Sequence, residues 1–197
     1  MKIGIIGGGN VGSSLAKLLT NAGHDVLVGS RNGINSAQDA ALHGDAVVLA
    51  LHYHAVADAL PPLADELDGK VVVDATNPLN DDWSPLLLGQ ENSAAEEIAR
   101  LVPNAHVVKA FNTIFADVMS KEKMDRASQK ITAFVASDED VALSTVAKLA
   151  DDMGFASVTI SKLSAARYLE AMAHLNIELA IGQDGGTNAA LIYHRAS

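Results

Sequence analysis

Three glycines near the amino terminus have the spacing of a phosphate-binding loop. Gly7, Gly9 and Gly12 form G-x-G-x-x-G between an apolar run and a helix-like stretch. In this context the first glycine permits a tight turn, the second lets the backbone approach a pyrophosphate, and the third packs the helix against the strand. The free N–H groups and positive dipole at the helix start then attract the diphosphate. We expect a dinucleotide here, its pyrophosphate bound by Gly7, Gly9, Asn10, Val11 and Gly12.

The end of the second strand-like run indicates which dinucleotide is bound. An NAD site usually places Asp or Glu there to hold the ribose 2′-hydroxyl. This chain instead has Ser30 and Arg31 after Gly29. Ser30 can donate a hydrogen bond to a 2′-phosphate, and Arg31 can pair with that phosphate or stack on adenine. The pattern favours NADP(H), the alternative being that Arg31 is a solvated surface residue.

Polar residues also follow three later strand-like runs. His52 ends the third run, and Asn77 and Asn112 follow the fourth and fifth. The carboxyl ends of parallel strands share one edge of a sheet, where doubly wound folds bind ligands. Uncharged amides suit a carboxamide or a neutral ring edge, and Pro78 fixes the backbone after Asn77. The alternatives are loop asparagines bonded to their own backbone and a histidine that faces solvent.

The sequence offers no acid–base pair or metal site. It has no Cys and no H-E-x-x-H, and Tyr168 is followed four residues later by Met172, where many short-chain dehydrogenases have Lys. We therefore assign no catalytic residue and no metal ligand. Hydride transfer between two rings depends chiefly on orientation and exclusion of water. The absence of a dyad thus favours a ring-type acceptor.

The elements that position these residues alternate along the chain. Apolar runs rich in Val and Ile predict buried parallel strands. They are Lys2–Ile6, Asp25–Gly29, Ala46–Leu51, Lys70–Asp74, His106–Ala110, Ile131–Ala136 and Ala156–Ile160. The helix-like stretches are Val11–Asn21, Ala37–Leu42, Ala55–Leu67, Ala94–Leu101, Glu139–Met153 and Leu163–Ile181. This alternation predicts an α/β fold with a doubly wound, mainly parallel sheet of the Rossmann type.

Composition limits the remaining possibilities. The chain has 197 residues, and its 14 basic and 24 acidic residues give a net charge of −10. We expect a single domain, residues 1–197, whose residues 163–197 form a C-terminal helical appendage. The negative charge argues against nucleic acid as a partner. No apolar run has the roughly 20 residues of a membrane span, so we expect a cytoplasmic protein without membrane contacts.

The last helix-like stretch is apolar around most of its circumference. Its polar residues Arg167, Glu170, His174 and Glu178 recur at three- and four-residue spacing and share one face. We expect that polar face to be solvated, and the apolar surface to form the interface of a homodimer.

Four sequence blocks together resemble the NADPH-dependent coenzyme F420 oxidoreductases. They are Gly7–Gly12, Gly29–Arg31, Asp74–Leu79 and Lys109–Thr113, and the resemblance extends over nearly the whole chain. The resemblance implies a small Rossmann domain that transfers hydride between NADP(H) and a small-molecule acceptor. That acceptor is the deazaflavin coenzyme F420 or a flavin-like ring. The expected cofactor contacts then also include Leu51, His52, Pro78 and Ala110. The loop 81–89 and the tail 185–188 differ from better-known members and could alter the acceptor pocket.

Two other functions fit the same residues. One is an NADPH-dependent imine reductase similar to pyrroline-5-carboxylate reductase, whose opening resembles Ile6–Asn10. That family carries a longer helical dimerisation domain, for which 197 residues leave little room. The other is a non-catalytic NADP(H) sensor. Activity with a panel of acceptors distinguishes the three.

Overall fold

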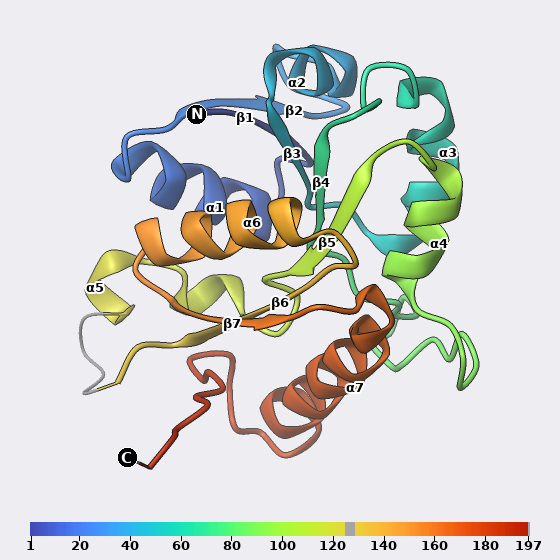
Figure 1. Ribbon diagram of the computed structural model, residues 1–197. Helices are drawn as coiled ribbons and strands as arrows, with labels where there is room; N and C mark the ends of the chain where they lie inside the picture. The colour runs from blue at the N-terminus through green and yellow to red at the C-terminus, as the bar shows by residue number, and fades with distance from the viewer. Residues whose placement is uncertain (125–128, 197) are drawn as a thin grey trace.

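The computed structural model describes residues 1–124 and 129–196, which build one seven-stranded sheet flanked by helices (Figure 1). The strand order is β2-β1-β3-β4-β5-β6-β7. The strands are β1 (Lys2–Ile6), β2 (Asp25–Gly29), β3 (Ala46–Leu49), β4 (Val71–Asp74), β5 (His106–Ala110), β6 (Thr132–Ala136) and β7 (Ala156–Ile160). All seven expected strands are present, and β3 ends before Leu51 and His52, which therefore lie in the following loop.

The sheet is parallel from β2 through β5 and changes direction at β6. Strand β6 pairs antiparallel with β5, and β7 pairs parallel with β6. A connection that turns back at the same edge of a sheet gives an antiparallel neighbour, whereas a parallel neighbour needs a crossover. The mainly parallel sheet is confirmed. The carboxyl ends of β6 and β7 lie at the opposite edge from those of β1 to β5.

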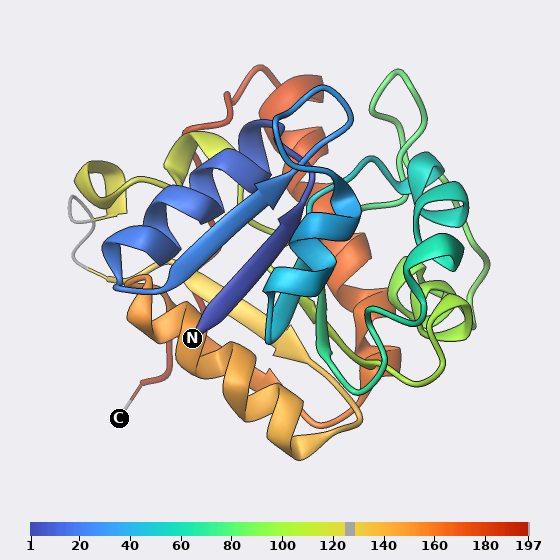
Figure 2. The ribbon, with the colours of Figure 1, turned by 90° about the horizontal axis from the view of Figure 1, so that it is seen from above.

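Helices cover both faces of the sheet. Helices α1 (Asn10–Asn21) and α6 (Asp140–Asp152) lie over one face, as Figure 1 shows. The other face is covered by α2 (Ala37–His43), α3 (Val56–Ala59) and α4 (Ala94–Leu101). Figure 2 shows β1 and β2 between α1 and α2. The doubly wound arrangement is thus confirmed, with one apolar core on each side of the sheet.

One expected helix is broken. In place of a helix over Ala55–Leu67, the chain forms three short pieces: η1 (Tyr53–Ala55), α3 and η2 (Pro61–Leu63). Pro61 and Pro62 lack the N–H groups that a continuous helix requires, and their rings clash with the preceding turn. The apolar positions Val56, Leu60, Leu63 and Leu67 are still buried, so the hydrophobic pattern is satisfied without a regular helix.

The remaining helices lie near the last strands and the carboxyl terminus. They are η3 (Ala116–Val118), α5 (Lys121–Met124), η4 (Leu163–Ala165), α7 (Ala166–Ile177) and a π-helical turn η5 (Glu178–Gly182). Leu169 of α7 packs with Phe134 and Ala136 of β6. No helix in the two described ranges combines the length and apolar character needed to cross a membrane.

Candidate functional site

The glycine loop has the geometry that its spacing predicts. Gly7 has φ +118°, and a Cβ there would lie 2.2 Å from the carbonyl oxygen of Ala50. A Cβ on Gly12 would lie 2.0 Å from the Gly7 carbonyl oxygen. Gly9 differs, because a Cβ on it would meet no atom within 4 Å. Space inside the fold therefore requires glycine at positions 7 and 12, whereas Gly9 lies beside open space that a ligand can fill.

The start of α1 is suited to an anion. Its first residue, Asn10, is exposed, Val11 is partly exposed, and Gly9 at the N-cap provides no side-chain cap. The first turn contains no acidic residue. The N–H groups at this helix start, together with the positive end of the helix dipole, are therefore available to a phosphate.

Ser30 and Arg31 lie in a turn at the end of β2. The Ser30 N–H donates to the Asn35 carbonyl at 3.0 Å, and the Gly33 N–H donates to the Ser30 carbonyl at 3.2 Å. A Cβ on Gly8 would lie 3.5 Å from the Ser30 Oγ, so this hydroxyl borders the glycine loop. The Arg31 side chain is exposed. The structure thus brings Ser30 to the glycine loop and leaves the Arg31 guanidinium at the surface beside it.

Asn77 and Asn112 come together and bond to each other. The Asn77 Nδ2 donates to the Asn112 carbonyl oxygen at 2.8 Å, and the Asn112 Nδ2 donates to the Asn77 Oδ1 at 3.0 Å. Asn112 Nδ2 also donates to the Leu169 carbonyl in α7 at 3.0 Å. We call Asn77 and Asn112 the amide pair. The two asparagines hold each other, and the bond from Asn112 to α7 fixes the pair at the sheet edge.

Phe111 has a left-handed backbone conformation that orients Asn112. Phe111 has φ +64° although it is not glycine, and its side chain is buried against Phe155. Such a conformation costs on the order of 1–2 kcal/mol for a residue with a Cβ. Packing of the ring holds it in place, and the turn directs Asn112 toward Asn77.

The other expected contacts lie at different depths. His52 is exposed, and Leu51 is partly exposed beside the glycine loop, its Cδ2 lying 3.3 Å from a Cβ built on Gly7. Pro78 is buried, and its carbonyl accepts hydrogen bonds from the Leu86 N–H and the His174 Nε2, both at 3.0 Å. Ala110 is fully buried at the end of β5, so its side chain supports the edge from within.

A buried charge cluster lies directly behind the amide pair. Lys109 of β5 is fully buried, and its Nζ lies 2.8 Å from Asp74 Oδ2, 2.9 Å from Glu170 Oε1 and 2.7 Å from the Thr76 carbonyl oxygen. Burial by itself lowers the pKa of Lys109, but the neighbouring Asp74 and Glu170 carboxylates outweigh it and raise the pKa. The ammonium is therefore a permanent charge and does not act as a base at neutral pH.

The sequence contains one indication of this cluster, but it does not identify all of the residues that form it. Lys109 interrupts an otherwise apolar strand, and a lysine inside such a strand needs a buried carboxylate partner. Asp74 is its register neighbour on β4. Glu170 lies 61 positions further along the chain than Lys109, so only the packing of α7 could reveal it.

The expectation of a solvated polar face on the last helix is wrong. Glu170 is buried, Arg167 forms a two-fold hydrogen bond with Glu96 at 2.7 and 2.9 Å, and His174 bonds to Pro78. Of the four stripe residues only Glu178 is exposed. The polar face turns inward because α4 and the loop after β4 supply partners for it.

Glu97 accepts hydrogen bonds from two further side chains near His52. The Tyr53 hydroxyl donates to Glu97 Oε2, and Asn92 Nδ2 donates to Glu97 Oε1 at 2.6 Å. Burial, and then the hydrogen bond with Glu97, raise the pKa of Tyr53. Tyr53 therefore stays protonated at neutral pH and acts as a hydrogen-bond donor.

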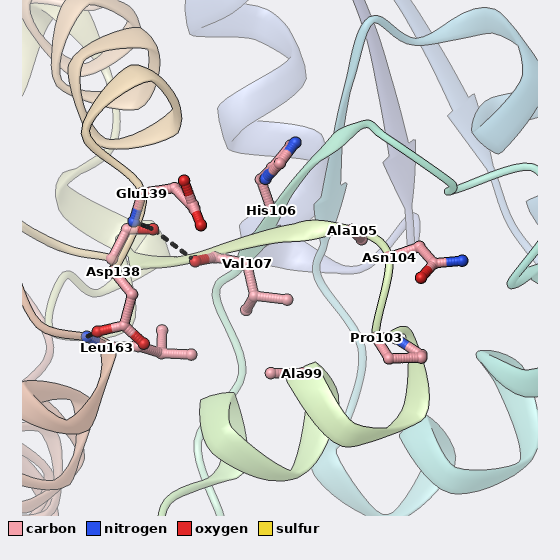
Figure 3. A pocket seen from close by; sticks show the side chains of 10 residues that line it. Ala99, Pro103, Asn104, Ala105, His106, Val107, Asp138, Glu139 and Leu163 are labelled. Atoms are coloured by element: carbon pink, nitrogen blue, oxygen red, sulfur yellow. Dashed lines mark hydrogen bonds between the residues drawn. The ribbon is translucent and has the colours of Figure 1, made fainter.

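A separate cavity lies at the other edge of the sheet. It measures about 230 Å³ and lies between the amino end of β5 and the carboxyl end of β6, with His106, Asp138 and Glu139 in its wall (Figure 3). Ser137 also lines the cavity, and its hydroxyl donates to the Val107 carbonyl oxygen at 2.8 Å. No group of three potential metal ligands occurs within the part of the chain that is described. This cavity is remote from the glycine loop because it lies at the amino end of β5, whereas the loop follows the carboxyl end of β1, which runs in the same direction.

Two alanine substitutions separate the roles of the loop glycines. We expect Gly12→Ala to lower the free energy of unfolding by about 1–3 kcal/mol, because its methyl group collides with the Gly7 carbonyl. Gly9→Ala should cost less than about 1 kcal/mol and yet weaken dinucleotide binding at least about 10-fold, because its methyl group enters the open space. Urea unfolding and a fluorescence titration with NADPH measure the two effects. Equal losses of stability in both variants would contradict this division.

Comparison with known proteins agrees with the geometry. The family model described as NADP oxidoreductase coenzyme F420-dependent matches residues 2–38 and 32–78. The F420-dependent NADP reductase of Methanothermobacter thermautotrophicus is 30% identical over 92% of this chain and 90% of its own length. A crystal structure from Arthrobacter sp. FB24, assigned to the F420-dependent NADP reductases, superposes with a TM-score of 0.89 at 28% identity, covering 99% of this chain and 100% of that one.

A further relative is much longer than this chain. Metalloreductase STEAP3 of Rattus norvegicus is 34% identical over 87% of this chain, which spans 36% of that relative's length. The similarity to the methanogen enzyme, by contrast, extends over nearly all of both proteins. This chain belongs to the F420-dependent NADP reductase family.

Proposed function

We propose that this chain is an NADPH-binding oxidoreductase that transfers hydride between NADP(H) and a deazaflavin such as coenzyme F420, or a flavin-like ring. The observation that carries the proposal is that the glycine loop and the amide pair lie at the same edge of the sheet. The glycine loop offers backbone N–H groups for phosphate, and the amide pair, whose amides bond to each other, forms a fixed uncharged surface against which a ring can lie. A doubly wound fold binds its ligands at this edge.

The phosphates are bound mostly by backbone and basic groups. Gly7, Gly9, Asn10, Val11 and Gly12 form the pyrophosphate loop at the start of α1. Ser30 and Arg31 bind the 2′-phosphate, and the Ser30 hydroxyl already borders the loop. The turn at positions 30–33 contains no carboxylate that would repel this phosphate. NADP(H) is therefore the dinucleotide that fits.

The nicotinamide and its acceptor are oriented by the loops after β3, β4 and β5. When bound, NADPH supplies a hydride, and the acceptor takes it up together with a proton from solvent. The amide pair and His52 orient the rings, while Leu51 and Pro78 shape the floor of the site. No side chain is needed as acid or base, because alignment and exclusion of water provide most of the rate.

The choice of NADP(H) over NAD(H) depends on Arg31. Removing its charge in Arg31→Ala should weaken NADPH binding about 10- to 100-fold, the usual value of a charged hydrogen bond, and leave NADH binding unchanged. Fluorescence titration with both cofactors measures this ratio. Lys17→Ala, an exposed change on the outer side of α1, is the control. An unchanged Kd for NADPH would refute the assignment of Arg31.

The acceptor is identified by stopped-flow oxidation of NADPH against a panel. We expect single-turnover reduction of coenzyme F420 to be the fastest, with FMN and FAD slower. A ferric chelate belongs in the panel because one group of relatives is named metalloreductases. Turnover with flavins alone would retain ring-to-ring transfer and exclude the deazaflavin.

The same panel tests the two alternatives. Oxidation of NADPH by a cyclic imine alone would indicate an imine reductase. Tight NADPH binding without turnover by any acceptor would favour an NADP(H) sensor that changes its affinity for a partner. The amide pair is uncharged and fits a planar neutral ring, whereas reduction of an imine also requires a proton donor.

We further propose a homodimer formed through α7, with residues 1–197 acting as one unit in the cytoplasm. The outward face of α7 carries Tyr168 and Leu175, and the π-helical turn η5 that continues it carries Leu179; their exposed fractions are 73%, 58% and 50%. These positions are seven and four residues apart and lie on one side of a helix. A two-fold partner that presents the same stripe would bury it.

Leu175→Asp tests the dimer. We expect sedimentation velocity to show a dimer for the unmodified chain at micromolar concentration and a monomer for this variant, because a carboxylate in an apolar interface is costly. Leu42→Asp, at a 62% exposed leucine on α2, should leave the dimer intact. A monomeric unmodified chain would refute the interface.

A further inference from the structure

Glu170 joins three elements that are far apart in the sequence. Its Oε1 lies 2.9 Å from Lys109 Nζ, and its Oε2 accepts a hydrogen bond from the Ala94 N–H at 3.0 Å. The Ala95 N–H donates to its Oε1 at 3.4 Å. A single carboxylate from α7 therefore satisfies both the buried lysine of β5 and the first N–H groups of α4.

Lys109 links Glu170 to the loop after β4. Lys109 has three N–H donors, and they meet Glu170, Asp74 and the Thr76 carbonyl oxygen. The other Asp74 oxygen accepts the Thr76 N–H at 2.8 Å. Both backbone groups of Thr76 are thus held, and Asn77 follows directly.

The contacts form a closed ring that includes the amide pair. Asn77 bonds to Asn112, and Asn112 Nδ2 donates to the carbonyl of Leu169, the residue before Glu170. The path from Glu170 through Lys109, Thr76, Asn77 and Asn112 therefore returns to α7. We therefore expect a change at Glu170 to alter the position of the amide pair, because among the described residues Asp74 and Glu170 are the side chains bonded to Lys109.

We propose that Glu170 is a positioning residue that fixes the amide pair by holding Lys109 and the start of α4. The inference rests on the proposed function, in which that pair orients the rings. Glu170 touches neither ring and acts through Lys109. The charges support this role, because two carboxylates and one ammonium leave a net charge of −1, which the positive end of α4 stabilises.

Glu170→Gln is the informative substitution. It keeps the size of the side chain and leaves Lys109 balanced by Asp74, so no buried charge loses its only partner. The glutamine amide, however, keeps one oxygen and replaces the other with an NH2 donor, which must face either the Lys109 ammonium or the Ala94 N–H, both of which are donors. We expect hydride transfer at saturating NADPH to slow at least about 10-fold, and the Kd for NADPH to change less than about 2-fold, because the glycine loop is untouched.

The matched control is Glu96→Gln. It breaks the Arg167–Glu96 pair, which joins the same two helices but does not contact Lys109. If Glu170 merely fastened α7 to α4, both variants would slow hydride transfer equally, and that result would overturn the proposal. Only Glu170→Gln should affect the rate.

A readout that does not depend on turnover completes the test. Hydrogen exchange of the Thr76 N–H and the NMR signals of the Asn77 and Asn112 side-chain amides report the ring directly. We expect faster exchange and shifted amide signals in Glu170→Gln but not in Glu96→Gln, and unchanged spectra would overturn the proposal. If Glu170→Gln does not fold, Glu170→Asp keeps the charge but is too short for both partners and should give the same spectral change.

The two readouts separate failure of this proposal from failure of the proposed function. Altered amide signals together with an undiminished rate would show that the pair moves without affecting hydride transfer, which overturns the positioning role. If none of the acceptors in the panel leads the unmodified chain to oxidise NADPH, the proposed function fails. The spectra then still decide whether Glu170 fixes the amide pair.

Discussion

A lysine ammonium without access to water is the constraint on which this half of the molecule depends. Removing such a charge from water costs several kcal/mol, and only close carboxylates and hydrogen-bond acceptors can offset that cost. For Lys109 the acceptors come from β4, the loop after it, and α7. These elements must therefore meet at one point. The requirement also fixes α4, whose first N–H groups share the Glu170 carboxylate.

The ligand edge combines a part made of backbone with a part made of side chains. In the proposed function the glycine loop recognises phosphate through backbone N–H groups and the dipole of α1, so this part of the site depends on the absence of side chains. The amide pair depends on side chains whose positions are fixed by partners in β4, β5 and α7. The first part is local and nearly self-contained, whereas the second requires the whole carboxyl half of the sheet. Substitutions in the two parts should therefore affect binding and hydride transfer differently.

Helix α7 has an unusual distribution of side chains. Its inward side carries Glu170 and Asn176 as well as Leu169, whereas Tyr168 and Leu175 face outward. A surface helix of a globular protein usually has its apolar residues inward and its polar residues outward. The inward polar groups have specific partners in the chain, such as the Thr113 carbonyl that accepts from Asn176 at 3.2 Å. The outward apolar groups are more than half exposed, and this asymmetry supports the proposal of a second copy as their partner.

The sequence by itself determined the geometry of the glycine loop, the seven strands and the edge at which Asn77 and Asn112 lie. These features depend on local properties, namely glycine spacing, apolar runs and the rule that parallel strands end at one edge. Only the tertiary structure decided the reversed direction of β6, the mutual bonding of the two asparagines and the burial of Glu170. Prolines 61 and 62 could have been recognised as a break, because their effect is also local. Glu170 could not, because a charged residue on a helix is normally solvated and its burial depends on a lysine and a helix start that are distant in the sequence.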